Sequence, residues 1–266
     1  IFNVIPNSDP AVRMAGRHVS DSTIEAIRKE WGFNDPLWQQ YLTTMKKVFT
    51  GDLKSQFTQL PVGKEIVKGL PRTFSLAIGA ALLWMFVAIC FGLYSAVKAG
   101  KFADRFLTII ALIGISMPVF WIGALMNYYL GFKLGWFPNG GYVEFTKDPI
   151  DWFYHLILPW TALAILFIGF YSRVLRSNVL DTINEDYVRT ARAKGLSERR
   201  ILIRHVLRNS MIPIVTLWGL DFGAVLGGGA ILTETVFDLQ GVGQYFVESI
   251  RRLDVPPVMA ITMYGA

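Results

Sequence analysis

Two long runs without a charged side chain dominate the chain, from Thr73 to Val97 and from Phe106 to Leu130. Each run is longer than the ~20 residues that an α-helix needs to cross the hydrocarbon core of a bilayer. We therefore expect transmembrane helices over residues 73–98 and 105–130.

Less regular apolar stretches follow in the second half of the chain. One runs into Arg173 and Arg176, whose long side chains can reach back to the headgroups, and another contains a single acid, Asp221. A last one opens with Pro256 and Pro257 and reaches the final residue. The expected spans in this half, the last of them partial, cover residues 156–180, 211–235 and 257–266. Because the chain starts without a methionine and stops inside an apolar stretch, we expect both ends to be truncated and a first transmembrane helix to be missing.

The composition favours a membrane protein over an ordinary soluble domain. Hydrophobic residues make up 53% of the chain and charged residues 17%, and the mean hydropathy is positive. The net charge of +6 could suggest a nucleic-acid partner, but the basic residues gather at the expected membrane edge, where anionic headgroups attract them. We expect an all-α integral membrane protein in contact with the lipid bilayer, and no nucleic-acid partner.

Lysine and arginine set the expected orientation, since short basic loops are retained in the cytoplasm. Residues 98–105 and 173–208 are basic, whereas residues 131–155 and 237–255 are poorer in basic side chains. We place the first two segments in the cytoplasm and the other two outside.

The same parity puts the start of the chain outside. We expect an extracytoplasmic segment over residues 1–70 and a transmembrane domain over residues 71–266. Within the outer segment, Ile24 and Ile27 recur at helical spacing, which predicts a short helix from Ser20 to Trp31.

The basic cytoplasmic segment has an internal pattern that charge retention alone does not require. Residues Ile183–Lys194 favour a helix, and Gly195 supplies a C-terminal stop. Ser197 with Glu198 can then cap a second helix. We expect a helix, an elbow and a helix within the loop 181–210. A docking element and a solvated charged loop both fit this pattern.

The loop resembles a known family. DYVRTARAKGLS at residues 186–197, followed by RHVLRN at residues 204–209, is similar to the cytoplasmic coupling loop of ABC-importer permeases in their dipeptide and oligopeptide branch. Further stretches resemble that branch: GDL at 51–53, LPRTFSLA at 70–77, ISMPVFWIG at 115–123, LGWFPNGGY at 134–142, HLILP at 155–159 and ETVFDLQGVGQ at 234–244. The wider importer pattern begins with Glu-Ala-Ala where Arg189, Thr190 and Ala191 stand here, a departure shared with the peptide branch.

The resemblance implies a type I ABC-importer transmembrane domain, the first permease of a pair, crossing the cytoplasmic (inner) membrane of a bacterium or archaeon several times. Its implied partners are a second homologous permease subunit, two cytoplasmic ATPase subunits and an extracytoplasmic substrate-binding protein. The implied cargo is di- or oligopeptides, with nickel, glutathione or another small solute as the alternative. The sequence contains no GxxxxGK[ST] phosphate loop. This agrees with the resemblance, which implies no catalytic residue and no cofactor in this chain, with ATP and Mg²⁺ bound by the ATPase subunits.

In the family, a short helix after the elbow sits in a groove of the ATPase. The resemblance assigns ATPase coupling to Asp186, Tyr187, Ala191, Ala193, Lys194, Gly195, Leu196 and Ser197. Gly195 then marks the elbow.

Candidates for the translocation pathway lie within or beside the spans: Asp221, Ser116, Pro118 and Glu234. A carboxylate at membrane depth is costly and marks a pathway or a paired site. Asp221 could therefore meet a peptide amino terminus, a cation of a partner subunit or a neighbouring helix. Pro118, after Ser116, predicts a kink. For Glu234, near the outer end of its span, we expect an N-terminal cap or a headgroup contact rather than substrate binding.

A function of another class stays open, an ion-gradient-coupled secondary transporter that uses Asp221 and Glu234. Such a carrier needs intramembrane charges but no docking elbow. The histidines, His18, His155 and His205, show no spacing typical of a metal site.

Overall fold

The computed structural model describes residues 10–15 and 20–265. Every regular element in these ranges is a helix, and extended pairing there is limited to a single bridge between Lys54 and Pro61. The expectation of an all-α fold is therefore confirmed. Three helices are long and apolar enough to cross a membrane, and a bent pair can supply a fourth crossing.

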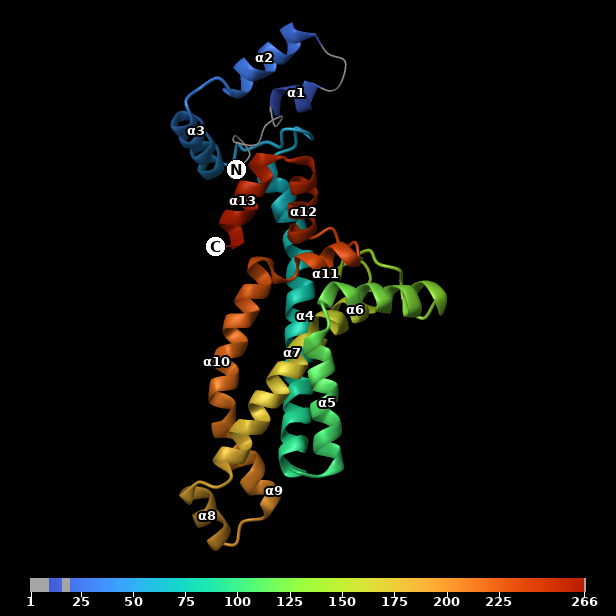
Figure 1. The fold of residues 1–266 in the computed structure, drawn as a ribbon, viewed down its shortest axis with the longest axis vertical. Coiled ribbons are helices and arrows are strands. Elements are labelled where there is room, and N and C mark those ends of the chain that lie inside the picture. The colour runs from blue at the N-terminus through green and yellow to red at the C-terminus, as the bar shows by residue number, and fades with distance from the viewer. Residues whose placement is uncertain (1–9, 16–19, 266) are drawn as a thin grey trace.

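The start of the chain forms three short helices at one end of an elongated molecule (Figure 1). They are α1 (Pro10–Ala15), α2 (Asp21–Trp31) and α3 (Leu37–Thr50). The helix predicted from Ser20 onward is α2. Ser20 precedes it in an extended conformation, and Gly32 ends it in the left-handed conformation that glycine adopts at low cost.

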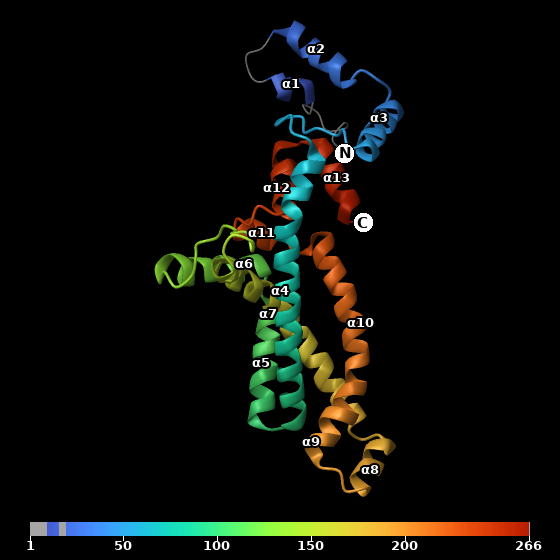
Figure 2. The ribbon, with the colours of Figure 1, turned by 180° about the vertical axis from the view of Figure 1, so that it is seen from behind.

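Two long helices form the centre of the molecule and pack along each other (Figures 1 and 2). They are α4 (Val62–Val97) and α7 (Pro149–Thr182). Ala77, Ala80 and Ala81 of α4 are fully buried, and small side chains of this kind let membrane helices approach closely. Trp84 of α4 and Tyr171 of α7 are the largest fully buried side chains. The core of the fold therefore lies between these two helices.

Both central helices begin earlier than the apolar pattern indicates. α4 starts at Val62 rather than Thr73, because the charged turns up to Arg72 favour helix even though they are too polar for the hydrocarbon core. α7 starts at Pro149, where the fixed φ of proline suits a first helical position. The Asp148 carboxylate caps this end by accepting two N–H groups of the first turn, at 3.0 Å each.

The expected span over residues 105–130 is not one continuous helix. It consists of α5 (Phe102–Ser116), α6 (Val119–Met126) and the π-helix η1 (Asn127–Lys133). The two parts are bent by 100° at Met117 and Pro118. Pro118 has no N–H to donate, and its ring disfavours a helical conformation at Met117, which is extended here. The kink expected at Pro118 is thus present, but it is sharp enough to send α6 sideways from the bundle (Figure 1).

The expected span over residues 211–235 is shifted. A continuous helical rod runs from Glu198 to Gly229 and is built from α9 (Glu198–Arg200), η2 (Ile201–Leu207), α10 (Arg208–Ala224) and η3 (Val225–Gly229). It breaks at Gly228, whose φ of 143° is accessible mainly to glycine. The chain then continues with α11 (Ile231–Val236), α12 (Val242–Arg252) and α13 (Val255–Gly265). The second half of the expected loop 181–210 is therefore part of the rod.

The two basic segments lie at the same end of the molecule. The turn between α4 and α5 and the hairpin of α8 (Asp186–Ala193) with α9 both lie at the lower end in Figure 1. Helices α1 to α3, α12 and α13 lie at the opposite end in both views (Figures 1 and 2). The two segments expected in the cytoplasm therefore share one end of the molecule, and the orientation itself stays a prediction.

Candidate functional site

The elbow of the basic loop is a defined structure. Helix α8 ends at Ala193, and Gly195 turns the chain with a φ of +75°. The N–H of Gly195 donates to the carbonyl of Arg192, and the N–H of Leu196 donates to the carbonyl of Ala191. A Cβ on Gly195 would meet no atom within 4 Å, so glycine is favoured here by the backbone conformation and not by lack of space.

Helix α8 is packed on the rod that follows the elbow. Val188 is fully buried and Ala191 is 5% exposed, both in the apolar cluster that also contains Ile201 and Val206 of η2. The Tyr187 hydroxyl accepts from the Asn209 amide nitrogen at 2.7 Å. Helix, elbow and rod are therefore packed together as one hairpin.

A second polar contact closes the open side of this hairpin. The Arg192 guanidinium pairs with the Glu198 carboxylate at 2.9 Å across the elbow. Both side chains are largely solvated, so this pair contributes little stability.

The tip of the hairpin is exposed. Asp186, Ala193, Lys194, Gly195 and Ser197 face solvent, and Leu196 is partly buried. Ala191 packs inside the hairpin, and its contact with an ATPase stays a prediction. The short helix also differs from the expectation, because α8 precedes Gly195 and the helix after Gly195 is the start of the long rod.

Asp221 lies on α10 and is partly buried. Its Oδ2 accepts a hydrogen bond of 2.5 Å from the hydroxyl of Tyr171 on α7. The structure thus contains the contact with a neighbouring helix that was one of the expectations for this acid. Its role in the pathway remains a prediction.

Ser116 and Pro118 are both exposed at the bend between α5 and α6. The Ser116 hydroxyl donates to the carbonyl of Leu112 at 2.8 Å. This side chain thus satisfies a carbonyl near the end of α5, where helical donors run out.

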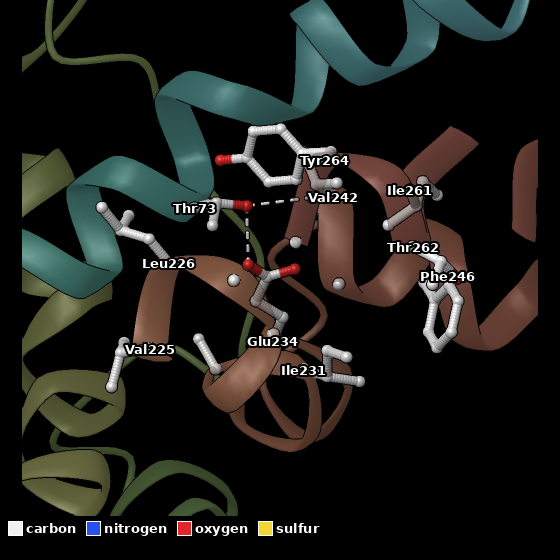
Figure 3. Close-up of a pocket in the computed structure, with 15 residues that line it drawn as sticks. Thr73, Val225, Leu226, Ile231, Glu234, Val242, Phe246, Ile261, Thr262 and Tyr264 are labelled. Carbon is white, nitrogen blue, oxygen red and sulfur yellow. Dashed lines mark hydrogen bonds between the residues drawn. The ribbon is translucent and has the colours of Figure 1, made fainter. Parts of the chain in front are cut away.

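Glu234 lies on α11 and is fully buried, which rules out the expected headgroup contact. It accepts from the Thr73 hydroxyl at 2.7 Å (Figure 3). It also accepts from the N–H of Gln244 at 3.0 Å. Since Gln244 is in the first turn of α12, the carboxylate does cap a helix N-terminus, as expected, but from another helix. Burial raises the pKa of Glu234, while the Thr73 hydroxyl and the N–H groups of Gln244 and Gly243 oppose the rise.

A cavity of about 350 Å³ lies beside Glu234, lined mainly by apolar side chains such as Val225, Ile231 and Phe246 (Figure 3). The Glu234 carboxylate is nevertheless sealed, because Thr73, Gly241 and Gly243 close around it. Its geometry ties α4, α11 and α12 together.

A cluster around Asp104 was missed by the sequence analysis. The Arg176 guanidinium donates two hydrogen bonds, of 2.6 and 2.8 Å, to the Asp104 carboxylate. The Ser95 hydroxyl and the N–H of Gly100 also donate to this carboxylate. Arg176, whose side chain could reach the headgroups on the evidence of the sequence, thus has a carboxylate of its own chain as its partner. The available signal was the acid itself, a single Asp within a basic turn.

No group of three metal-ligating side chains occurs in the part of the chain that the structure describes. The His155 ring lies 3.1 Å from the Asp151 carboxylate of its own helix. His18 lies outside the described residues.

Comparison with known proteins extends these observations over the whole chain. A family model described as binding-protein-dependent transport system inner membrane component matches residues 88–266. A second, described as the N-terminal part of such a membrane component, matches residues 1–77.

Curated relatives align over almost all of this chain. The probable peptide ABC transporter permease protein y4tP of Sinorhizobium fredii is 37% identical over 95% of this chain and 81% of its own length. The oligopeptide transport system permease protein AppB of Bacillus subtilis is 36% identical over 97% of this chain and 83% of its own length. The dipeptide transport system permease protein DppB of Alkalihalophilus pseudofirmus is 34% identical over 98% of this chain and 84% of its own length.

Solved structures share the fold at low sequence identity. A chain of the MetNI methionine ABC transporter in an inward-facing conformation superposes with a TM-score of 0.57 at 16% identity, covering 77% of this chain and 94% of that one. A chain of an amino acid ABC transporter gives a TM-score of 0.54 at 14% identity, covering 76% and 86%. With this fold, and with a family model that matches residues 88–266, the chain belongs to the binding-protein-dependent transport system inner membrane components, which are multi-pass membrane subunits.

Proposed function

We propose that this chain is the first of two permease subunits in an ATP-driven importer of di- and oligopeptides. The α8 hairpin is the observation that carries the proposal. One face of α8 is buried against the rod, and the tip of the hairpin is exposed at the basic end of the molecule. The peptide and dipeptide relatives, aligned over nearly the whole chain, support the cargo.

The hairpin suits the transfer of motion from an ATPase to the membrane helices. Its tip around Lys194 and Gly195 offers exposed surface to a cytoplasmic partner. Its inner face is fixed to the rod through Val188 and Val206. A push on the tip therefore displaces the rod 198–229, since helices transmit displacement along their axis.

The proposed assembly contains a second permease subunit, two ATPase subunits that bind ATP and Mg²⁺, and an external binding protein that delivers the peptide. In this assembly, the chain itself contributes no catalytic residue and no cofactor. Nickel, glutathione or another small solute is the alternative cargo.

Reconstitution tests the proposal. Vesicles containing both permeases and the ATPases, supplied with external binding protein and labelled di- to pentapeptides, should accumulate peptide only when internal ATP is present. Nickel and glutathione serve as cargo controls in the same vesicles. Uptake driven by a proton or sodium gradient without ATP would contradict the proposal and favour the secondary transporter.

A further inference from the structure

Asp221 is a charged group in a membrane helix without a cation to balance it. In the described part of the chain, no lysine, arginine or histidine lies within ion-pair distance of its carboxylate. An unbalanced carboxylate at this depth is costly and is retained where it has a function. The contrast within this chain is Asp104, which is fully paired with Arg176.

The carboxylate is held in place but not saturated. Tyr171, itself fully buried, donates its hydroxyl to Oδ2 at 2.5 Å. Oδ1 accepts no hydrogen bond from any residue that the structure describes, and Asp221 remains partly exposed. An ionised carboxylate can accept about four hydrogen bonds. A donor from outside this chain can therefore bind to Asp221.

Trp218 comes three residues before Asp221 on α10, so the two side chains are neighbours on the helix surface, and Phe222 directly follows Asp221. Trp218 and Phe222 stack with centroids 5.4 Å apart and planes within 4° of parallel. The Trp218 indole also donates to the carbonyl of Ala81 at 3.2 Å, which fixes it against α4. Aromatic faces next to a carboxylate are the chemistry that recognises an organic ammonium group.

The helix that carries this group is open on its other side. Only 11% of the most apolar stretch of the rod is buried, against 39% in α4 and 44% in α7. Gly219 and Gly223 lie two residues to either side of Asp221, on the opposite face of α10, and a Cβ on either would meet no atom within 4 Å. Asp221 is itself partly exposed, so a substrate that approaches α10 can reach its carboxylate without displacing other helices of this chain.

We infer that Asp221, oriented by Tyr171 and flanked by Trp218 and Phe222, is a specificity-determining residue that binds the terminal ammonium group of a passing peptide. The inference rests on the proposed function. Tyr171 acts as a positioning residue, because its hydroxyl fixes one carboxylate oxygen and leaves the other for the substrate.

The test uses the complex of both permeases and the ATPases without the binding protein, so that recognition by the permease is measured alone. The probes are a photoreactive dipeptide with a free amine and its N-acetylated form. A charge-assisted hydrogen bond predicts that the free amine labels the wild-type permease about tenfold or more over the acetylated form. Asp221→Asn should abolish this preference, Asp221→Glu should retain part of it, and Tyr171→Phe should weaken it.

Thr216→Val is the matched control, because Thr216 is exposed on the same helix and its hydroxyl donates to the carbonyl of Ile212, within its own helix. This variant should label as the wild type does. Equal labelling by both probes in the wild type, or a preference that survives in Asp221→Asn, would overturn the inference.

If the two permease subunits no longer assemble in the Asp221→Asn variant, the inference is also overturned, since Asp221 would then balance a cation of the partner subunit. Absence of ATP-driven peptide uptake by the wild type would overturn the proposed function and this inference with it. Uptake by the wild type with no amine preference would overturn the inference alone.

Discussion

The pair of Asp104 and Arg176 shows how single residues fix the cytoplasmic end of the bundle. The Asp104 side chain is 5% exposed and lies in the first turn of α5, whereas Arg176 lies on α7. Removing one member of a buried pair leaves an unbalanced charge, which costs about 3–5 kcal/mol. We expect Arg176→Met to lower the free energy of unfolding by about that amount, measured by thermal or denaturant unfolding in detergent.

Arg173 provides the control for this prediction, because it is exposed one turn earlier on the same helix. Arg173→Met should change stability by less than about 0.5 kcal/mol. Adding Asp104→Asn to Arg176→Met should recover part of the loss, since the uncompensated carboxylate is then gone. Equal destabilisation by both arginine variants would show that the pair does not stabilise the fold.

Glu234 predicts a pH dependence of stability. Its pKa in the folded protein is raised by burial, so the unfolded chain ionises first as the pH rises. The stability of the wild type should therefore be highest below the usual glutamate pKa and fall as the pH rises through the raised value. Glu234→Gln cannot ionise and should remove this component. Unfolding midpoints measured across the pH range in detergent for both proteins check the prediction, and parallel pH profiles would contradict it.

At the scale of elements, hydrophobic pattern located the membrane helices but not their ends. The uncharged run begins after the first turns of α4, because a helix can continue into water through residues such as Lys64 and Arg72. The pattern also gave no sign that the rod continues from α9 to Gly229, since η2 carries the basic residues Arg204 and His205.

The sequence indicates only in part where helices bend and which side chains form hydrogen bonds with each other. Pro118 predicts a break, yet its angle of 100° depends on where α6 finds packing partners, such as α7 and α11. Asp221 was identified from its charge alone. Its partner Tyr171 is neutral and 50 residues away in the chain, so no local signal connects the two.

Helix α8 supports a prediction about contacts with the ATPase. Ala193 is exposed at the tip, whereas Ala191 on the same helix is 5% exposed and packs inside the hairpin. A photoreactive maleimide on a cysteine at residue 193 should crosslink to the ATPase subunit, in a background where Cys90→Ala removes the only native cysteine of this chain. The same substitution at residue 191 is the control and should label poorly, because the thiol is shielded. Crosslinking at neither position, with the complex intact, would contradict docking through α8.

At the scale of the whole molecule, the fold separates a packed core from an open rod. α4 and α7 pack against each other, and Asp104 of α5 links to both, through the ion pair with Arg176 of α7 and the hydrogen bond from Ser95 of α4. The rod 198–229 carries the hairpin at one end and Asp221 near the other, and few of its residues are buried. A displacement at the elbow therefore reaches the outer half of the membrane with little repacking of the core.

In the proposed importer, the elbow at Gly195 couples ATP hydrolysis to transport, and this coupling is a property of the assembled complex. Gly195 and Gly100 make a matched pair, since they have φ of +75° and +76° and open space around them. Valine at either position imposes the same backbone strain, about 1–3 kcal/mol. Only Gly195 lies in the hairpin, whereas Gly100 lies in the turn between α4 and α5 at the same end of the molecule.

The decisive measurement is peptide uptake and ATP hydrolysis recorded together in vesicles containing the complete importer, for the wild type, Gly195→Val and Gly100→Val. We expect Gly195→Val to lower the peptide taken up per ATP at least about tenfold while the complex stays assembled and hydrolyses ATP, and Gly100→Val to keep the wild-type ratio. An unchanged ratio in Gly195→Val, or an equal loss in both variants, would contradict this coupling.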